Sequence, residues 1–414
     1  MKKADPGRIE KHLKELNAFN STPECGTTRV VFTDVELKGR EYVKGIMRGT
    51  GLAVKEDSIG NVFATLPGSD PSLAPVWTGS HIDTVLCGGM FDGMAGVFGG
   101  IEALRLIRES GIKHKRDISA VVYTSEEPTR FQVSCLGSRA MAGDLTLEDT
   151  KGISDKDGNT LYDVLCRLGY DMGRFGEIKR GPGSVYAAVE LHVEQNRRLE
   201  DDGRKIGIVK AICAPTNFDV IVTGVQSHAG GTSMEARRDA YMAACELALI
   251  LEKLARENTE SEYTTATVGR VKVSPGSVNA IPGRCEFSVD IRDVDFESKR
   301  KLTERFLSEC AAVELRRGVS VSHVMHNQDI PLRCSEEISG IIEKYVKTAG
   351  LPYEKMISGP YHDSMFVGRF APVGMIFVPS RNGISHSPEE WTDFAEIAAG
   401  TDVLAETLAE LANR

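Results

Sequence analysis

The chain has 414 residues, a formal net charge of −9 and 41% hydrophobic residues. This length allows more than one domain, and the composition is ordinary for a globular protein. The negative charge and the lack of a long basic run argue against nucleic acid as the main partner, because phosphate contacts need clustered Lys and Arg. No apolar run approaches the roughly 20 residues of a membrane span. Residues 1–16 also lack the apolar core of a signal peptide.

Nine cysteines are scattered along the chain, and no two form a CxxC pair. An odd number without paired spacing predicts reduced thiols and not a disulfide framework. We therefore expect a cytoplasmic protein in which most cysteines are small core residues.

The first half of the chain predicts alternating helices and strands. Amphipathic helices are expected over 7–20 and 35–50. A buried strand over 75–85 leads through a glycine-rich loop into a helix over 94–110, and a second apolar strand follows over 117–128. This alternation predicts an α/β fold with a mainly parallel sheet. In such sheets, ligands bind at the carboxyl ends of the strands.

The pattern changes near residue 213. The following residues predict strands and two strong helices, and the larger domain resumes after about residue 330, ending in a helix over 393–414. We expect a small α+β domain of residues 213–329, inserted into a larger domain of residues 1–212 and 330–414. The elements predicted for the insertion are strands at 218–230, 264–273, 284–295 and 319–326, and helices at 237–258 and 297–318.

Imidazole and carboxylate side chains follow several predicted strand ends, and together they could bind two divalent metal ions. The candidate ligands are His81, Asp92, Glu127, His192 and His386. Asp92 would bridge the ions, because the glycines around it let the backbone bend sharply. Asp83 would accept a hydrogen bond from His81 and fix its tautomer. The HVMH stretch at 323–326 also looks like a metal pair, but we expect it to be structural.

Several motifs resemble one enzyme family over essentially the whole chain. They are GSHIDTV and GMFDGMAG within 79–96, YTSEEPTRF, ELHVEQ, GVQSHAGGTSMEARRDA and GMIFVPSRNGISHSPEE. They resemble the hydantoinase/carbamoylase branch of the dinuclear-metal amidohydrolases, within the aminoacylase/carboxypeptidase superfamily. The resemblance implies a catalytic domain of the dinuclear-metal aminopeptidase type. It also implies an inserted four-stranded lid domain that forms a homodimer interface.

The resemblance also implies roles for individual residues. His81, Asp92 and His192 would hold one ion, and Asp92, Glu127 and His386 the other; Mn²⁺ or Zn²⁺ suits these ligands. Glu126 would be the catalytic acid and base, and the peptide bond after Asp92 would be cis. His228 would stabilise a developing oxyanion. The expected substrate-binding residues, some reaching the partner subunit's cleft, are Gln195, Asn279, Arg292, Tyr361 and His362.

Three stretches resemble the ureidoglycolate-hydrolysing members of the branch. They are residues 126–143, residues 210–220 and residues 358–366, which include Tyr361. The expected substrate is a small ureido acid, (S)-ureidoglycolate, whose hydrolysis leads to glyoxylate, ammonia and CO2. Asn196 stands where related sequences usually have Gly, and we expect it to keep the turn by adopting a left-handed backbone.

Other functions remain open at this point. An N-carbamoyl-L-amino acid hydrolase is the main alternative, followed by an allantoate amidohydrolase or a β-ureidopropionase. A metallopeptidase would share the fold and the metal ligands. A non-catalytic binding protein is opposed by the complete ligand set and by Glu126.

Overall fold

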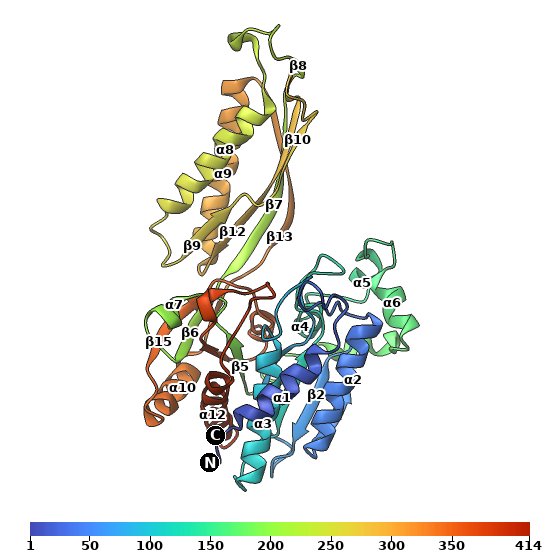
Figure 1. Ribbon diagram of the computed structural model, residues 1–414, viewed down its shortest axis with the longest axis vertical. Coiled ribbons are helices and arrows are strands. Elements are labelled where there is room, and N and C mark those ends of the chain that lie inside the picture. The colour runs from blue at the N-terminus through green and yellow to red at the C-terminus, as the bar shows by residue number, and fades with distance from the viewer. The chain divides into compact units, whose positions relative to one another are not determined.

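The computed structural model describes residues 1–414 and divides into two compact units (Figure 1). Unit 1 contains Met1–Lys210 and Cys334–Arg414, and unit 2 contains Ala211–Arg333. The predicted insertion, residues 213–329, falls within unit 2. No helix in the structure combines the length and the apolar character needed to cross a membrane.

Unit 1 is built on a mixed sheet whose four central strands are parallel. In spatial order these are β4 (Ile118–Tyr123), β3 (Val76–His81), β5 (Ala187–Val193) and β16 (Val373–Val378). Every residue of these strands is buried, as expected for parallel strands covered on both faces. The predicted mainly parallel central sheet is therefore confirmed.

Shorter strands extend this sheet on both sides. On one side, β2 (Val62–Leu66) and β1 (Ala53–Glu56) are antiparallel. On the other side, β6 (Ile206–Ile212) runs antiparallel to β16 and also pairs with β14 (Leu332–Arg333) and β15 (Tyr353–Ser358).

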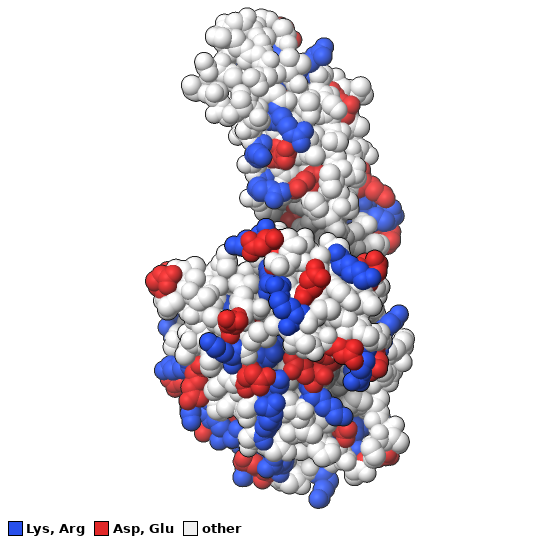
Figure 2. Space-filling view, turned by 90° about the vertical axis from the view of Figure 1, so that its right-hand side faces the viewer, with Lys and Arg blue, Asp and Glu red and all other residues white.

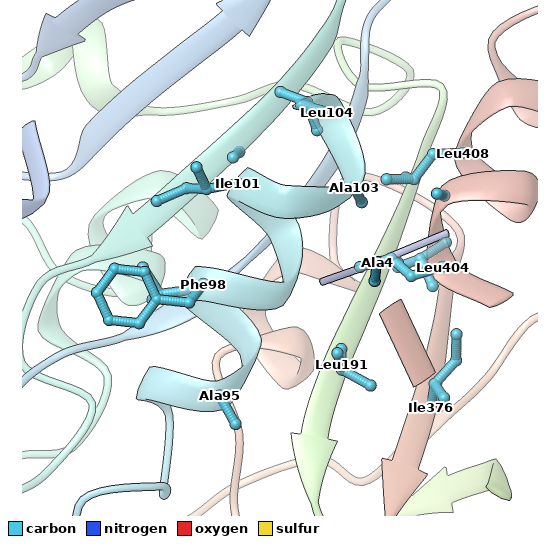
Figure 3. Packing of buried hydrophobic residues seen from close by; sticks show 14 of the residues in the cluster. Ala4, Ala95, Phe98, Ile101, Ala103, Leu104, Leu191, Ile376, Leu404 and Leu408 are labelled. Carbon is cyan, nitrogen blue, oxygen red and sulfur yellow. The ribbon is translucent and has the colours of Figure 1, made fainter. Parts of the chain in front are cut away.

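Helices cover the central strands and form the main core with them. Figure 3 shows Phe98, Ile101 and Leu104 of α3 (Met94–Glu109), with Leu191 of β5 and Leu404 and Leu408 of α12 (Phe394–Leu411). A Cβ atom at Gly96 would lie 2.2 Å from the carbonyl oxygen of Leu191, so α3 can approach β5 this closely only with glycine there. This close packing fixes the start of α3, just after Asp92. The other helices of unit 1 are α1 (Pro6–Asn17), α2 (Asp34–Gly49), α4 (Leu136–Ala142), α5 (Asp149–Gly152), α6 (Leu161–Arg167), η1 (Met172–Ile178), α7 (Arg198–Asp201), α10 (Glu336–Thr348), α11 (Ser364–Val367) and η3 (Arg381–Gly383).

Unit 2 has an antiparallel sheet with two long helices packed on one face (Figure 1). The strand order is β10 (Val271–Ser274), β12 (Arg284–Asp293), β7 (Ala214–Thr223) and β13 (Ser320–Gln328). A fifth strand, β9 (Thr264–Thr267), pairs with the end of β12 that β10 leaves uncovered. The sheet is therefore four strands wide. The remaining elements are the helices α8 (Ala240–Arg256) and α9 (Phe296–Arg317), the short strands β8 (Ser227–His228) and β11 (Ala280–Ile281), and η2 (Met234–Ala236).

Charged side chains of both signs are mixed over most of the face that Figure 2 displays. That face shows no extended basic stripe of the kind that follows a phosphate backbone. Few charged side chains lie at the end of unit 2 that carries β8 (Figure 2).

Two sequence-based expectations are wrong: that all nine cysteines are reduced thiols, and that the peptide bond after Asp92 is cis. Cys25 and Cys87 form a disulfide, although they are 62 positions apart. Backbone hydrogen bonds between Thr27 and Gly88 bring the two cysteine segments together. No local sequence pattern predicts that these two cysteines pair. Five of the seven free cysteines are buried, as expected. The peptide bond after Asp92 is not cis, since the cis bond in the structure is Ser274–Pro275.

Candidate metal centre

The candidate ligands come from different segments that meet at one edge of the sheet in unit 1. His81 is the last residue of β3, and His192 lies near the end of β5. Glu127 follows β4, Asp92 precedes α3, and His386 follows β16. The carboxyl ends of parallel strands share one edge, so the topology itself gathers these side chains.

Asp92 lies between two groups of potential ligands. Its Oδ1 atom is 3.2 Å from Nε2 of His192 and 3.7 Å from Nε2 of His81. Its Oδ2 atom is 3.1 Å from Nε2 of His386, which is 3.3 Å from Oε1 of Glu127. Within each group, the potential ligand atoms lie within 4.8 Å of one another. The two carboxylate oxygens of Asp92 thus face different groups, as a bridging carboxylate requires.

Two of the histidines have a tautomer fixed by backbone carbonyls. Nδ1 of His81 lies 3.0 Å from the carbonyl oxygen of Asp83, and Nδ1 of His192 lies 2.9 Å from that of Val193. A carbonyl only accepts, so each Nδ1 carries a hydrogen and each Nε2 of a neutral ring presents a lone pair. The lone pair of His192 accepts from the backbone N–H of Gly93 over 3.2 Å, and Oδ1 of Asp92 lies at the same distance from this nitrogen. A cation beside both the ring nitrogens and the Asp92 carboxylate would stabilise this arrangement.

The pKa values reflect this need for positive charge. Burial opposes ionisation of Asp92, but the bonds from His192 and His386 outweigh it and hold the pKa of this carboxyl well below its usual range. The bond to Asp92 raises the pKa of His192 to about 9 against the effect of burial. Bonds to Asp92 and Glu127 raise the pKa of His386 to about 11. Divalent cations can replace such protons, so these residues fit a metal site.

Gln195 also belongs to this cluster. Its Nε2 atom donates to Oδ2 of Asp92 over 2.8 Å, and its buried Oε1 atom has no hydrogen-bond partner. Gln195, and not Asn196, adopts the left-handed backbone, with φ of 57°. Asn196 is exposed, and its Oδ1 atom accepts from the backbone N–H of Arg197. The expectation that Asn196 provides the left-handed turn is therefore wrong.

The carboxylate of Asp83 does not make the expected contact with His81. It lies 3.8 Å from Nδ1 of His81, which is too long for a hydrogen bond. Instead, its two oxygens accept from the backbone N–H groups of Glu126 and Glu127, over 3.2 and 3.0 Å. Asp83 therefore orients His81 through its backbone carbonyl and fixes the two glutamates through its carboxylate.

Glu126 is buried beside the candidate ligands, with Oε2 3.9 Å from Nε2 of His81. Burial raises the pKa of its carboxyl well above the usual range, and the neighbouring carboxylates Glu127, Asp363, Asp92 and Asp83 add to this. The raised pKa favours the protonated form of Glu126, which is the direction that an acid–base catalyst needs.

Glu390 contacts two of the ligand segments, and sequence reasoning missed it. Its Oε1 atom accepts from the backbone N–H groups of Phe91 and Asp92, over 2.8 and 3.0 Å. Its Oε2 atom accepts from the hydroxyl of Ser385, next to His386, over 3.0 Å. Glu390 therefore ties the Asp92 loop to the His386 loop. The only sequence signal was a second acid shortly after His386.

His362 lies beside the cluster, and its neighbour Tyr361 contacts Arg139 and the Phe366 ring. The His362 ring is edge-on to that of His192, with centroids 4.6 Å apart, and its Nε2 lies 2.9 Å from the hydroxyl of Ser358. Glu190, His192 and His362 form a third group of potential ligands, but it shares His192 with the first. Hydroxyls of Ser80 and Ser364 donate to the carboxylate of Glu190, so we interpret this group as a hydrogen-bonded network.

The candidates in unit 2 lie at two different ends of its sheet. His228 pairs with Ala280, and the backbone of Ala229 donates to the carbonyl of Asn279, so His228 and Asn279 are neighbours. Nδ1 of His228 accepts from the N–H groups of two glycines, over 3.1 Å each, which leaves the hydrogen of a neutral ring on Nε2. Arg292 lies near the other end of β12, where its Nη2 donates to Asp290 over 3.0 Å.

The HVMH stretch has its own partners in the unit 2 sheet. Nε2 of His326 lies 3.1 Å from Oδ2 of Asp219, and Arg270 donates to both oxygens of Asp219. The His323 ring packs edge-on against Phe218. These contacts agree with a structural role for the stretch.

Comparisons with known proteins agree with this geometry. The model of peptidase family M20/M25/M40 matches residues 77–410. A ureidoglycolate hydrolase from Oryza sativa subsp. japonica is 39% identical over 98% of this chain and 85% of the relative. An N-carbamoyl-L-amino acid amidohydrolase from Geobacillus stearothermophilus is 36% identical over 98% of both chains.

A solved structure is similar over nearly its whole length. The crystal structure of AtUAH in complex with glyoxylate superposes with a TM-score of 0.86 at 37% identity, covering 99% of this chain and 98% of the other. The predicted family is thus confirmed: the chain is a hydrolase that belongs to peptidase family M20/M25/M40.

Proposed function

We propose that the chain hydrolyses the ureido C–N bond of (S)-ureidoglycolate, a reaction that leads to glyoxylate, ammonia and CO2. One structural observation carries this choice of substrate. Two of the ureidoglycolate-like segments, 126–143 and 358–366, contact each other beside the candidate metal centre. Ser138 donates to Asp363 and Arg139 donates to Tyr361. The ureidoglycolate hydrolases from rice and Arabidopsis thaliana, at 39% and 38% identity, support the same choice.

The proposed cofactor is a pair of divalent ions, Mn²⁺ or Zn²⁺. His81, Asp92 and His192 would hold one ion, and Asp92, Glu127 and His386 the other, because Asp92 divides the ligands in this way. When bound, such ions polarise a carbonyl and lower the pKa of water. This chemistry suits a ureido carbonyl, which is a poor electrophile because two nitrogens donate electrons to it.

Glu126 is the proposed acid and base. It would take a proton from the attacking water and return it to the leaving nitrogen as the C–N bond breaks. Asp83 holds the backbone of Glu126 through one hydrogen bond, and Gln195 holds Asp92 through another. In this proposal His362, Tyr361 and Gln195 contact the substrate from unit 1.

If His228, Asn279 and Arg292 of unit 2 all bind the substrate, they must come from two copies of the chain. His228 and Asn279 lie next to the start of β12 at Arg284, whereas Arg292 lies eight residues along the same strand. At about 3.3 Å per residue, the two sites are roughly 26 Å apart, which is too far for one small acid to touch both. We propose a homodimer in which His228 and Asn279 serve the partner's site as lid residues, while Arg292 binds the substrate carboxylate.

Exposed apolar side chains on unit 2 support such an interface. Monomers rarely leave large apolar patches in water, and several large apolar residues of this unit are at least half exposed. They are Val225, Met234, Leu249, Val271, Val278, Leu315, Val324 and Ile330. Light scattering on the purified protein should give the mass of two chains, and a monomer at all concentrations would refute the dimer.

The deciding experiment is ammonia release from a substrate panel by the Mn²⁺-loaded protein. The panel contains (S)-ureidoglycolate, allantoate, N-carbamoyl-L-amino acids and N-carbamoyl-β-alanine, with Glu126→Gln as the inactive control. Dipeptides are assayed in parallel by the release of free amino acids, because their hydrolysis yields no ammonia. Turnover of ureidoglycolate alone supports the proposal. Preference for an N-carbamoyl-L-amino acid, the function of the relative from Geobacillus stearothermophilus, would replace the substrate and keep the mechanism. Turnover of dipeptides alone would make the chain a peptidase.

A further inference from the structure

Arg29 is a fully buried arginine of unit 1 that the proposed reaction does not use. Its side chain is 0% exposed and makes no ion pair with a carboxylate. Burial lowers the pKa of its guanidinium to about 10, and the charges of Glu36 and Asp83 oppose this shift. The guanidinium therefore stays protonated at neutral pH. A buried charge without an ion partner is costly unless its hydrogen bonds are made, so these bonds indicate what the residue does.

The guanidinium donates to groups from three separate segments. Nη1 donates to the carbonyls of Leu16 and Phe19, around the end of α1, over 3.0 and 2.9 Å. Nε donates to the carbonyl of Ile82 over 2.7 Å, and Nη2 donates to the sulfur of Met94. Arginine presents its N–H donors in one rigid plane, so a single side chain can hold three segments in a fixed arrangement.

Two of these contacts lie beside candidate metal ligands. Ile82 directly follows His81 in the chain, and Met94 comes two residues after Asp92. His81 and Asp92 belong to the same group of potential ligands, and their atoms Nε2 and Oδ1 are 3.7 Å apart. Arg29 thus connects, through one rigid group, the segment that carries His81 with the segment that carries Asp92.

Arg29 is itself held in place on two sides. Its backbone N–H donates to Oγ1 of Thr84 over 2.8 Å, and its carbonyl accepts from the N–H of Thr84 over 3.1 Å. On another side, a Cβ atom at Gly39 of α2 would lie only 3.1 Å from Cδ of Arg29. These contacts leave the side chain little freedom, so its donors can fix the position of the groups that accept from them.

The second group of potential ligands has no comparable connection to Arg29. Glu127 follows β4 and His386 follows β16, and the hydrogen bonds of Arg29 reach neither of these segments. The second group shares only Asp92 with the first. Loss of the guanidinium should therefore disturb the first group more than the second.

We propose that Arg29 is a positioning residue that keeps His81 and Asp92 at the spacing that one metal ion requires. The guanidinium touches neither the ion nor the substrate, and it acts through the backbone carbonyl of Ile82 and the side chain of Met94. This inference rests on the pair of ions in the proposed function, and it is independent of the choice of substrate.

The test measures Mn²⁺ binding by calorimetry, without substrate, in two backgrounds that each keep one ligand group complete. His386→Ala keeps the group of His81, Asp92 and His192, and His192→Ala keeps the other. Adding Arg29→Met to His386→Ala should weaken Mn²⁺ binding by about 10- to 100-fold, the usual cost of losing a contact that orients a ligand. Adding it to His192→Ala should leave the affinity nearly unchanged.

Two further variants separate positioning from folding. Arg29→Lys keeps the charge on a single nitrogen, so it should restore part of the affinity that Arg29→Met loses. Met94→Leu nearly conserves the buried volume and removes only the sulfur acceptor, so the fold should tolerate it. It should weaken the first group by a smaller factor, and it should have no further effect in the Arg29→Met background.

Lys299→Met is the matched control. Lys299 is also 0% exposed, and its ammonium donates to the carbonyls of Ala214, Pro215 and Asp329 in unit 2. Its replacement removes a fully buried cation that binds backbone carbonyls far along the chain from every candidate ligand. The free energy of unfolding should fall, and the Mn²⁺ affinity of both ligand groups should stay unchanged.

The outcomes that would overturn the inference can be told apart. If the unaltered protein binds no Mn²⁺, the proposed pair of ions fails and the role of Arg29 fails with it. If the unaltered protein binds Mn²⁺ but Arg29→Met weakens both groups equally or neither group, the role of Arg29 alone is refuted. Thermal unfolding without metal identifies any variant that does not fold, and the result for Met94→Leu then decides.

Discussion

The candidate functional residues of the two units differ in how far they are buried and held by hydrogen bonds within their own unit. In unit 1, His81, Asp92 and Glu127 are at most 7% exposed, and hydrogen bonds orient their side chains or backbones. His386 is exposed, but its ring still lies against the carboxylates of Asp92 and Glu127. In unit 2, His228 is exposed and lies far along the sheet from Arg292. In the proposed function, the bond-breaking residues are therefore those of unit 1, and the unit 2 residues act in the site of a partner.

The largest expected effect is in unit 1. Glu126→Gln removes the proposed proton carrier and keeps the size of the side chain, so kcat should fall by about 10²- to 10⁴-fold. Because Glu126 belongs to neither candidate ligand group, metal content should stay at the wild-type level. Stopped assays measure kcat, and metal analysis of the same sample measures the metal content. Loss of metal together with activity would instead make Glu126 a ligand.

The next effect tests whether unit 2 serves a partner. His228→Ala should lower kcat by about 10²- to 10³-fold, the usual cost of losing one oxyanion donor. A heterodimer of one Glu126→Gln chain and one His228→Ala chain then holds one intact site, if His228 acts in the partner. Its activity should return to about half of the wild-type value.

Differently tagged, co-expressed chains allow this heterodimer to be purified. The matched control is a heterodimer of Glu126→Gln with Asp92→Asn, which are both unit 1 changes. Each subunit of that control lacks one group of its own site, so its activity should stay low. An equally low activity in the Glu126→Gln and His228→Ala heterodimer would mean that His228 does not act in the partner's site.

Metal binding should strengthen as the pH rises. The raised pKa values of His192, about 9, and His386, about 11, mean that both rings are protonated at pH 7 without a metal ion. A metal ion needs the neutral ring, so binding must release these protons. Each proton released makes the affinity rise about tenfold per pH unit below the ring's pKa. Calorimetry in buffers of different ionisation enthalpy should detect the protons, and binding without proton release would contradict the assignment.

A smaller effect on activity is expected at Asp83. Asp83→Asn keeps the backbone carbonyl that orients His81, but its amide cannot accept from both Glu126 and Glu127 N–H groups. Changes to such supporting contacts cost about 10- to 100-fold. We expect this loss in kcat with little loss of metal. A loss of bound metal larger than the loss of kcat would mean that the Asp83 carboxylate supports the metal ligand His81, and not Glu126.

The sequence predicted features that depend on local patterns. The long helices lie within a few residues of their predicted ranges, because amphipathic periodicity can be recognised within one short stretch of sequence. The predicted ligands meet because strand ends share one edge of the sheet. By contrast, the predicted strand over 218–230 is interrupted: β7 ends at Thr223, residues 224–226 belong to no strand, and β8 covers only Ser227–His228 before a turn begins.

Contacts between distant segments could not be predicted in this way. The role of Glu390 depends on the approach of the Asp92 and His386 loops, which are almost 300 residues apart. The Asp83 carboxylate faces the Glu126 backbone because β3 and β4 are neighbours in the sheet. In both cases the acid was visible in the sequence, but its partner is a backbone group that no side-chain pattern marks.

The disulfide should contribute to stability and not to the reaction. Closing a loop of this length stabilises a fold by about 4 kcal/mol in the chain-entropy description. The double change of Cys25 and Cys87 to Ser should lower the free energy of unfolding by about that amount. The kcat value should be unchanged, because the backbone pairing of Thr27 with Gly88 still holds the loop.

Cys166, an exposed free cysteine, provides the control for this last prediction. Cys166→Ser should leave the free energy of unfolding unchanged, and a mild reductant should destabilise it as much as it destabilises the wild type. The reductant should have no effect on the variant without Cys25 and Cys87. The predicted cytoplasmic location favours reduced thiols, so the two expectations oppose each other. Thiol counting in protein from freshly lysed cells decides between them: seven free thiols mean that the bond forms there, and nine mean that it does not.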